Sequence, residues 1–538
     1  MMNQGWTTHL GILWVAVLCG CKNIPTESPL PTTSKVSKLE RSSVLPPSQG
    51  VSNNSDSPVI PVVLEQPAEP VSPADPPPLM DGPPQTLNLQ TVVSSVEERY
   101  PLLVSALLDR NIAEGKQLSA WGEFDLGLKT FHIAAPEGFY RTYRNGVALE
   151  QPTFGGGYLY GGYKIGDGKF QPWFGERETN EGGEFSAGFG MPLLKDRSID
   201  KRREALFKAD LARRAVEPAI QAQFLEFVRV ASQTYWIWVA AGQSLQAQQE
   251  LLKLAQIRVN QIETRVDAGD LPKIARLNNE QLIASRETKV IESQRKLQES
   301  AIKLSLFLRD PQGQPIIPPE QQLPPEYPPH PPLPKEPLDT LIVRAVTARP
   351  ELLELQLISR QVRVELAQAE NLLLPKLDAR MLAAKDVGAP ASSKGDKTPF
   401  ELEVGLYGEV PLQRREARGK VASAQSKLSQ IDVKRQFVTN KVTALVQDAV
   451  SALTAAQQRI TRATQNVRLA QETLVLARQQ FDAGDIDLIA LNIYEQAVTD
   501  ARLLLIASQT DYFLALADFH AALSIDPSTL SAELGEKP

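Results

Sequence analysis

The sequence from Arg478 to Ile525 reads RQQFDAGDIDLIALNIYEQAVTDARLLLIASQTDYFLALADFHAALSI. Its Ala483-Gly484-Asp485 tripeptide interrupts a helical pattern that continues on both sides. Because glycine adopts backbone conformations that other residues avoid, this tripeptide predicts a bend between two helices. After the bend, residues recur at alternating steps of three and four, as in a coiled-coil seam: Leu503, Ile506, Thr510, Phe513 and Ala517. The stretch therefore predicts the end and the returning arm of a long helical hairpin.

An earlier stretch, which begins at Arg265, repeats this pattern. It reads RVDAGDLPKIARLNNEQLIASRETKVIESQRKLQESAIKLSLFLRD and aligns with the later stretch without a gap at an offset of 215 residues. The identical pairs are Asp267/Asp482, Ala268/Ala483, Gly269/Gly484, Asp270/Asp485, Ile274/Ile489, Ala275/Ala490, Glu280/Glu495, Gln281/Gln496, Ile291/Ile506, Ser293/Ser508, Gln294/Gln509 and Leu308/Leu523. Such a repeat predicts one structural unit used twice.

The composition argues against several classes of protein. A formal net charge of −6 over 538 residues lacks the strong basic excess of a nucleic-acid-binding protein. The histidines are scattered and the only cysteines are Cys19 and Cys21, so no spacing fits a zinc site or a disulfide framework. The Gly-rich stretch 154–170 is not followed by a helical pattern, so it is not a phosphate-binding loop. We expect no catalytic site, no metal and no cofactor.

The N-terminus carries a short apolar run, Leu10 to Leu18, that ends in Leu18-Cys19-Gly20-Cys21. A membrane-spanning helix needs about 20 apolar residues, so this run suits an export signal better. Its end resembles a bacterial lipobox in which Cys21 receives the lipid. Residues 1–21 are therefore interpreted as a lipoprotein-type signal peptide, and the alternative is a plain signal peptide that ends near a cysteine by chance.

Composition divides the rest of the chain. Residues 22–84 are rich in Pro, Ser and Thr and predict a disordered tether, because they hold few large apolar side chains. Helical periodicity begins near Thr86, and we assign the first repeat to 85–310. The segment 311–337 is a Pro-rich linker that cannot be helical. The second repeat spans 338–526, and 527–538 is a C-terminal tail.

Two stretches in each repeat show an alternation of period two, which predicts strands. In the first repeat, the apolar residues of this pattern are Phe124, Leu126 and Leu128, and then Phe185, Ala187, Phe189, Met191 and Leu193. In the second they are Leu377, Ala379 and Met381, and then Phe400, Leu402, Val404 and Leu406. The region 154–170 between the first two predicts further strand or hairpin structure.

Strands with one apolar and one polar face match those of a membrane barrel. The alternative is a soluble sheet with one face on a core, but the neighbouring helices offer no obvious core. After the last strand of each repeat comes a basic cluster: Lys195, Arg197, Lys201, Arg202 and Arg203, and then Arg414, Arg415, Arg418 and Lys420. These residues start a solvated helix or lie near lipid headgroups. Uninterrupted helices from there to the bends would reach about 100 Å.

In combination, these features resemble the TolC family of outer-membrane efflux proteins over residues 85 to 526. The strand-strand-helix-helix order occurs twice, and two segments resemble the family near the third strand: ARPEL at 348–352 and LLPKL at 373–377. A Val410-Pro411-Leu412 step precedes a basic helix start, and YEQAVTDARLLLIASQTDYFLALADFHAAL follows the second bend.

The resemblance implies a mainly α-helical fold with a membrane β-barrel. Three protomers would each give four strands to one twelve-stranded barrel and helical hairpins to a periplasmic tunnel. A homotrimer also agrees with physics, because four strands cannot close a barrel and an open sheet edge is not tolerated in lipid. The expected location is the bacterial outer membrane, with the helices in the periplasm and a lipid anchor.

The expected function is a passive export duct. The resemblance implies that it receives substrate from an inner-membrane transporter through a periplasmic adaptor protein. The alternative is a non-conducting coiled-coil lipoprotein that acts as a spacer in the cell envelope, and an enzyme is the weakest hypothesis. Neither the cargo nor the individual partners can be read from the sequence.

Both bends are expected at the far periplasmic tip, where they would dock the adaptor. The docking residues would be Gly269, Asp270, Leu271, Gly484, Asp485 and Ile486. In the best-known relative, acidic side chains shortly after the second bend form a cation-binding ring in the lumen. The positions that match that ring here are Ala490 and Ile493, and those of the first repeat are Ala275 and Asn278.

These residues offer no charge to a cation, so we expect a closed tip held by apolar packing rather than by a carboxylate ring. Asp485 and Asp487 lie closer to the bend and are the residues that would alter this expectation if they point inward.

Overall fold

A computed structural model describes residues 86–170, 178–391 and 400–525. The chain divides into two units, Met1–Met80 and Asp81–Pro538, and the described residues all belong to the second. Cys21, the predicted tether and the predicted C-terminal tail lie outside the described residues, so their assignments remain predictions.

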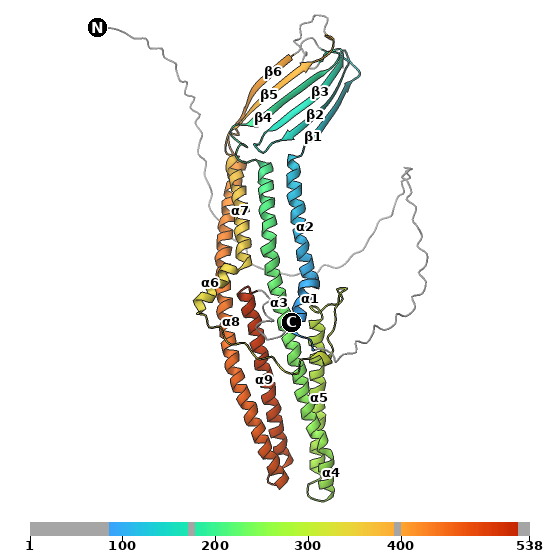
Figure 1. The fold of residues 1–538 in the computed structure, drawn as a ribbon, viewed down its shortest axis with the longest axis vertical. Helices are drawn as coiled ribbons and strands as arrows, with labels where there is room; N and C mark the ends of the chain where they lie inside the picture. The colour runs from blue at the N-terminus through green and yellow to red at the C-terminus, as the bar shows by residue number, and fades with distance from the viewer. Residues whose placement is uncertain (1–85, 171–177, 392–399, 526–538) are drawn as a thin grey trace, which may run out of the picture. The chain divides into compact units, whose positions relative to one another are not determined.

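The described chain is mostly helical (Figure 1). Its α-helices are α1 (Leu89–Arg99), α2 (Pro101–Trp121), α3 (Lys201–Ile257), α4 (Val259–Asp267), α5 (Ile274–Leu304), α6 (Leu338–Ala348), α7 (Pro350–Asn371), α8 (Arg415–Ala483) and α9 (Leu488–Ala522), with 3₁₀ turns η1 (Gly122–Phe124) and η2 (Glu320–Gln322). No helix among these residues is long and apolar enough to cross a membrane.

Two pairs of long helices form the hairpins predicted around the glycines. Helix α8 runs for 69 residues to Gly484, which at about 1.5 Å per residue is the predicted length of about 100 Å. The path to Gly269 is not one helix, which corrects the expectation of an uninterrupted rod. It is interrupted at Arg258, between α3 and α4. The side chain of this arginine points into a buried ionic cluster.

Six strands of the described residues form one antiparallel sheet in the order β1-β2-β3-β4-β5-β6. They are β1 (Gly127–Ala135), β2 (Thr142–Pro152), β3 (Tyr158–Gly168), β4 (Glu184–Pro192), β5 (Lys376–Asp386) and β6 (Phe400–Glu409). The strands predicted near 185–193, 377–381 and 400–406 are confirmed as β4, β5 and β6. The prediction of four strands in one protomer is wrong, because the first half contributes four rather than two.

The error has a physical reason. In β3, small glycines (Gly161, Gly162 and Gly166) stand where the alternation would need side chains, so the pattern is blurred. The stretch 154–170 contains β3, which confirms the prediction of strand and hairpin structure there. The alternation predicted a strand at Phe124, and this is wrong. Phe124 lies in a 3₁₀ turn that buries its ring, and β1 begins only at Gly127.

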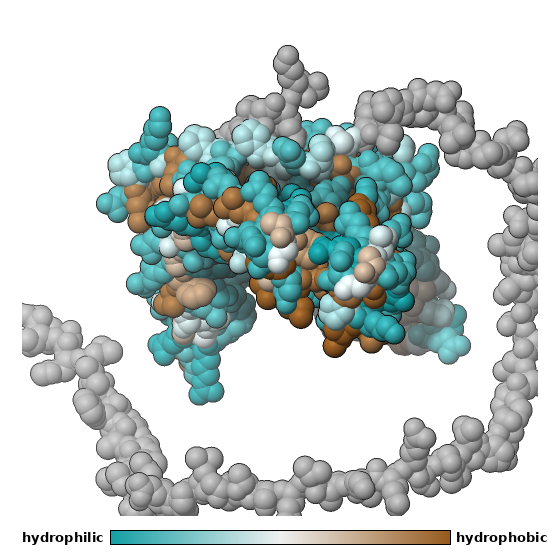
Figure 2. Space-filling model, turned by 90° about the horizontal axis from the view of Figure 1, so that it is seen from below, coloured by the Kyte–Doolittle hydropathy of each residue, from teal (hydrophilic) through white to brown (hydrophobic). Residues whose placement is uncertain are grey.

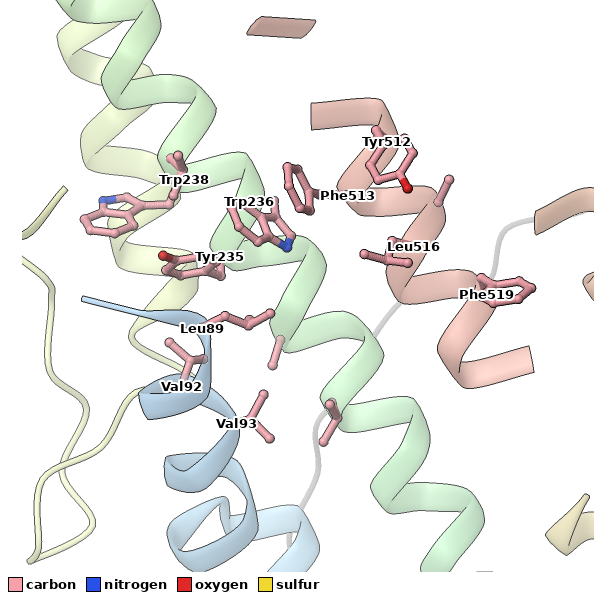
Figure 3. Packing of buried hydrophobic residues seen from close by; sticks show 14 of the residues in the cluster. Leu89, Val92, Val93, Tyr235, Trp236, Trp238, Tyr512, Phe513, Leu516 and Phe519 are labelled. Carbon is pink, nitrogen blue, oxygen red and sulfur yellow. The ribbon is translucent and has the colours of Figure 1, made fainter. Parts of the chain in front are cut away.

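The main hydrophobic core lies where both hairpins meet the N-terminal helix. Trp236 of α3 stacks on Phe513 of α9 with their ring centroids 4.0 Å apart. Leu89, Val92 and Val93 of α1 belong to the same buried cluster, as Figure 3 shows. Helical stability comes mostly from packing of an apolar face, and residues of both hairpins share this one core. This core therefore joins the two halves of the chain.

The Pro-rich linker packs onto the same core. Tyr327 stacks on both Trp236 and Phe513, and its hydroxyl lies 2.8 Å from the hydroxyl of Thr510. The Tyr512 hydroxyl donates to the carbonyl of Pro331 at 2.5 Å. As predicted, the linker contains no α-helix among its described residues. It is held in place by aromatic contacts instead.

Replacing Phe513 tests the importance of this core. The ring is 2% exposed, so Phe513→Ala is expected to lower the free energy of unfolding by about 3–5 kcal/mol. Phe139, which is 85% exposed, provides the matched control, and Phe139→Ala should change that free energy by less than about 0.5 kcal/mol. Denaturant titration of the detergent-solubilised protein measures both, and equal losses would contradict the assigned role.

Candidate functional site

The two bends have the same backbone geometry. Gly269 and Gly484 both have φ of +86°, in the left-handed region that favours glycine. The amide of Asp270 donates to the carbonyl of Arg265, and the amide of Asp485 donates to that of Gln480, both at 2.8 Å. Each bond spans five residues just past the helix end, as in a Schellman motif. The repeated AGD sequence thus closes both helices in the same way.

The structure brings the six predicted docking residues to the ends of the two hairpins, at the end away from the sheet (Figure 1). Asp270 and Asp485 are exposed, whereas Leu271 and Ile486 are partly buried. An added methyl group at either glycine would meet no atom within 4 Å. The bends are therefore open surfaces, and whether they dock an adaptor remains a prediction.

The predicted gate residues fall into different environments. Ala275 is 7% exposed and belongs to an apolar cluster with Ile262 and Leu488, so it packs inside the chain. Asn278 and Ala490 are partly buried, and Ile493 is 62% exposed. The Asp487 side chain accepts a hydrogen bond from the amide of Ala490 at 2.8 Å.

Asp487 therefore caps the start of α9, a local role that the sequence signal could have shown, since Asp is a preferred helix N-cap. The gate assignments stay predictions.

Exposed apolar side chains gather near the bends. They are Ile274 and Leu277 after the first bend and Ile489 and Ile493 after the second, each between 55% and 63% exposed. A view from this end shows hydrophobic patches among hydrophilic residues (Figure 2). Apolar groups exposed in this number usually mark a surface that contacts another molecule.

A buried ionic cluster joins the two hairpins a short distance from the bends. The Glu495 carboxylate on α9 is 1% exposed and pairs with the guanidinium of Arg258, and with that of Arg286 on α5 at 3.3 Å. Arg258 also donates to the Asn492 side chain at 2.8 Å, and Arg286 donates to the carbonyl of Leu251 at 2.7 Å.

Burial lowers the pKa of the Arg286 guanidinium from its ordinary value, and Glu495 acts in the opposite direction. The cluster fixes one hairpin to the other, because removal of its only carboxylate would leave two buried arginines without compensation. Sequence reasoning missed it, since the arginines are more than two hundred residues from Glu495. The one signal was the repeated pair Glu280/Glu495, but Glu280 is exposed.

The six-stranded sheet has two different faces. One face carries ion pairs between neighbouring strands: Lys129 with Glu150 at 2.6 Å, and Lys164 with Glu184 at 2.9 Å. On the same face, the Arg380 guanidinium lies over the Tyr407 ring, 4.5 Å from its centroid. We call this the polar face.

The opposite face is apolar and uncovered. Its side chains include Leu149 (47% exposed), Phe185 (57%), Val404 (71%) and Leu406 (69%). Figure 1 shows no described helix over either face of the sheet. A soluble sheet would bury such a face against a core, so this exposed apolar face favours the lipid interpretation over the soluble one.

Arg203, from the first basic cluster, is not available to headgroups. It is 6% exposed and donates to the carbonyls of Asp196, Arg197 and Ser198 at 2.6 to 3.0 Å. It therefore holds the turn between β4 and α3. No group of three or more metal-ligating side chains lies together in the described part of the chain.

Glu495→Gln tests the ionic cluster. Because it leaves two buried guanidinium groups unpaired, it is expected to lower the free energy of unfolding by about 3–5 kcal/mol. Glu280, the exposed residue that matches Glu495 in the first repeat, gives the control. Glu280→Gln should change the free energy of unfolding by less than about 0.5 kcal/mol. Denaturant titration gives the energies, and hydrogen exchange over α4 and α9 should accelerate only in Glu495→Gln. Similar behaviour of both variants would refute the role of the cluster.

No model of a known protein family and no curated protein matches this sequence. Several solved structures do match it. The outer-membrane protein VceC from Vibrio cholerae is 16% identical with a TM-score of 0.58, and the alignment covers 81% of this chain and 96% of that one. The open-state MtrE outer-membrane channel from Neisseria gonorrhoeae is 15% identical with a TM-score of 0.56, covering 81% and 88%.

The CmeC outer-membrane channel from Campylobacter jejuni is 13% identical with a TM-score of 0.58, and the alignment covers 84% of this chain and 90% of that one. At these identities the likeness shows the fold alone. MtrE and CmeC are described as outer-membrane channels and VceC as an outer-membrane protein. The chain therefore has the fold of outer-membrane channels, and the resemblance inferred from its motifs is confirmed at the level of the fold.

Proposed function

We propose that this protein is the outer-membrane channel of an efflux or secretion system, a passive trimeric duct. The observation that carries this proposal is the sheet, with an uncovered apolar face on one side and ion pairs on the other. That arrangement suits a wall between lipid and water. The shared fold with outer-membrane channels supports the same conclusion.

The helical part is proposed to extend into the periplasm as a tunnel. Its open bends, with exposed Asp270 and Asp485, would meet a periplasmic adaptor that connects the duct to an inner-membrane transporter. The exposed apolar side chains beside the bends suit contacts with other protein surfaces. A lipid on Cys21 would add an anchor to the outer membrane.

Ion conductance tests the channel directly. The purified trimer in a planar bilayer is expected to conduct weakly, because a polar lumen inside a closed wall admits water and ions and the proposed tip narrows this path without sealing it. The control is the same preparation after heat denaturation. A trimer that inserts but never conducts would instead support the spacer lipoprotein.

The tip is tested by a change at the second bend. Proline fixes φ near −65°, which is incompatible with the φ of +86° at Gly484, so Gly484→Pro should distort this bend. We expect export by the complete system to be lost, while trimer formation and membrane insertion stay intact. Gly115, which lies in the middle of α2 with open space around it, offers a control as Gly115→Ala. Normal export by Gly484→Pro would refute the docking role.

The closed tip is proposed to be held by apolar contacts that include Ile493. Because Asp487 is engaged as a helix cap, a ring of free carboxylates is not expected there. A trivalent cation on the periplasmic side of a planar bilayer should therefore leave conductance unchanged at micromolar concentration. Micromolar block would reveal a carboxylate ring after all, and Asp485→Asn and Asp487→Asn would show which side chain forms it.

A further inference from the structure

The sheet has two edges that no described strand covers. β1 pairs only with β2 and β6 pairs only with β5, so each edge presents a row of unpaired backbone amides and carbonyls. In lipid, each such group left without a partner costs several kcal/mol. If the sheet is a membrane wall, as the proposed function requires, both edges need a partner strand.

The extra strands β2 and β3 are integral parts of this wall. β2 pairs with β3 over eleven residues, from Thr142 to Pro152, and β4 pairs with the other side of β3 from Tyr158 to Lys164, so β3 is an inner strand of the sheet. Leu149 of β2 lies opposite Leu128 of β1 and Gly161 of β3, all on the apolar face. At this level the apolar side chains continue from the other strands through β2 to β1, whereas Thr130, His132 and Asn145 give the same face a polar stretch further along these two strands. A wall of only four strands per copy would have to break the pairing between β2 and β3.

The two edges match each other in direction. Because neighbouring strands alternate and their number is even, β6 of one copy runs antiparallel to β1 of the next. Side chains of antiparallel neighbours that lie opposite each other share a face. In any register of this pairing, Leu128 of β1 in one copy lies on the same face of the wall as Val404 and Leu406 of β6 in the next copy.

The two edges also match in charge. On the polar face, β6 carries Glu401, Glu403 and Glu409, and neither Glu401 nor Glu409 forms an ion pair with any described residue. β1 carries Lys129 on that face, with a side chain that is 61% exposed even though it pairs with Glu150. An acidic edge therefore meets an edge with a basic side chain.

We propose that β1 of each copy pairs with β6 of the next copy, so that three copies close an eighteen-stranded barrel. The inference rests on the proposed trimer and adds the seam and the number of strands. Barrel diameter grows roughly linearly with strand number, so this barrel is about 1.5 times wider than one of twelve strands. Its cross-section is about twice as large, in the range in which barrels leave an open aqueous lumen.

Disulfide mapping in outer membranes tests the seam. Thr130→Cys, on the apolar face of β1, is combined in turn with a cysteine at each position of β6 on that face: Phe400, Leu402, Val404, Leu406 and Gly408. Phe131→Cys replaces the next residue of β1, which points to the polar face, and serves as the matched control. Gly161→Cys on β3, combined with the same β6 cysteines, tests the four-strand wall, in which β3 would be the edge strand that meets β6 of the next copy. Its new side chain meets open space.

Oxidation is expected to link Thr130→Cys with at least one of the five β6 positions, giving covalent dimers and trimers. Phe131→Cys and Gly161→Cys should give none. Links from Gly161→Cys would show a twelve-stranded barrel and overturn the inference. So would a complete absence of links in a preparation that is trimeric by native mass measurement and conducts ions.

The same mass and conductance measurements separate the two proposals. If the trimer conducts but lacks the β1–β6 link, the proposed channel function stands and only the proposed pairing of β1 with β6 is wrong. A monomer that does not conduct removes the channel function as well. Projection images of the detergent-solubilised trimer give a second measurement, in which a barrel of twelve-strand width would contradict the eighteen-stranded wall.

Discussion

The stacking of Trp236 on Phe513 joins two hairpins that are otherwise connected in sequence only through the Pro-rich linker, α6, α7, β5 and β6. Long helices of mixed composition gain little stability from their own backbone, so packing between helices must provide it, both within each hairpin and between the two. The aromatic cluster does so at the level where α1 also packs. Tyr327 extends the same stack, so a linker without α-helix becomes part of the core rather than a loose connection.

Local sequence signals were sufficient wherever the structure is decided by neighbouring residues. Both AGD bends form at the predicted glycines, each with the positive φ that glycine favours. The clear alternation of β6 was also sufficient, since its apolar residues occur every second position. In β2 and β3 the same period is present but is blurred, because Asn145 and several glycines occupy positions on the pattern. Strand count was therefore the main error.

The ionic cluster around Glu495 could not be predicted because it depends on contacts between distant parts of the sequence. Arg258, Arg286 and Glu495 each look like ordinary surface residues of an amphipathic helix when read alone. Their pairing depends on how two hairpins lie against each other, which no local pattern encodes. Asp487 shows the reverse case: it was considered as a pore residue, yet its position before a helix already favoured the cap that the structure contains.

The interruption at Arg258 makes the two hairpins differ in helical continuity. Helix α8 is a continuous rod along its full length, whereas the corresponding arm of the first hairpin has a joint one residue long between α3 and α4. The same residue that interrupts the arm places its guanidinium against Glu495, so the point at which the first hairpin loses helical continuity is also a point at which an ion pair ties it to the second.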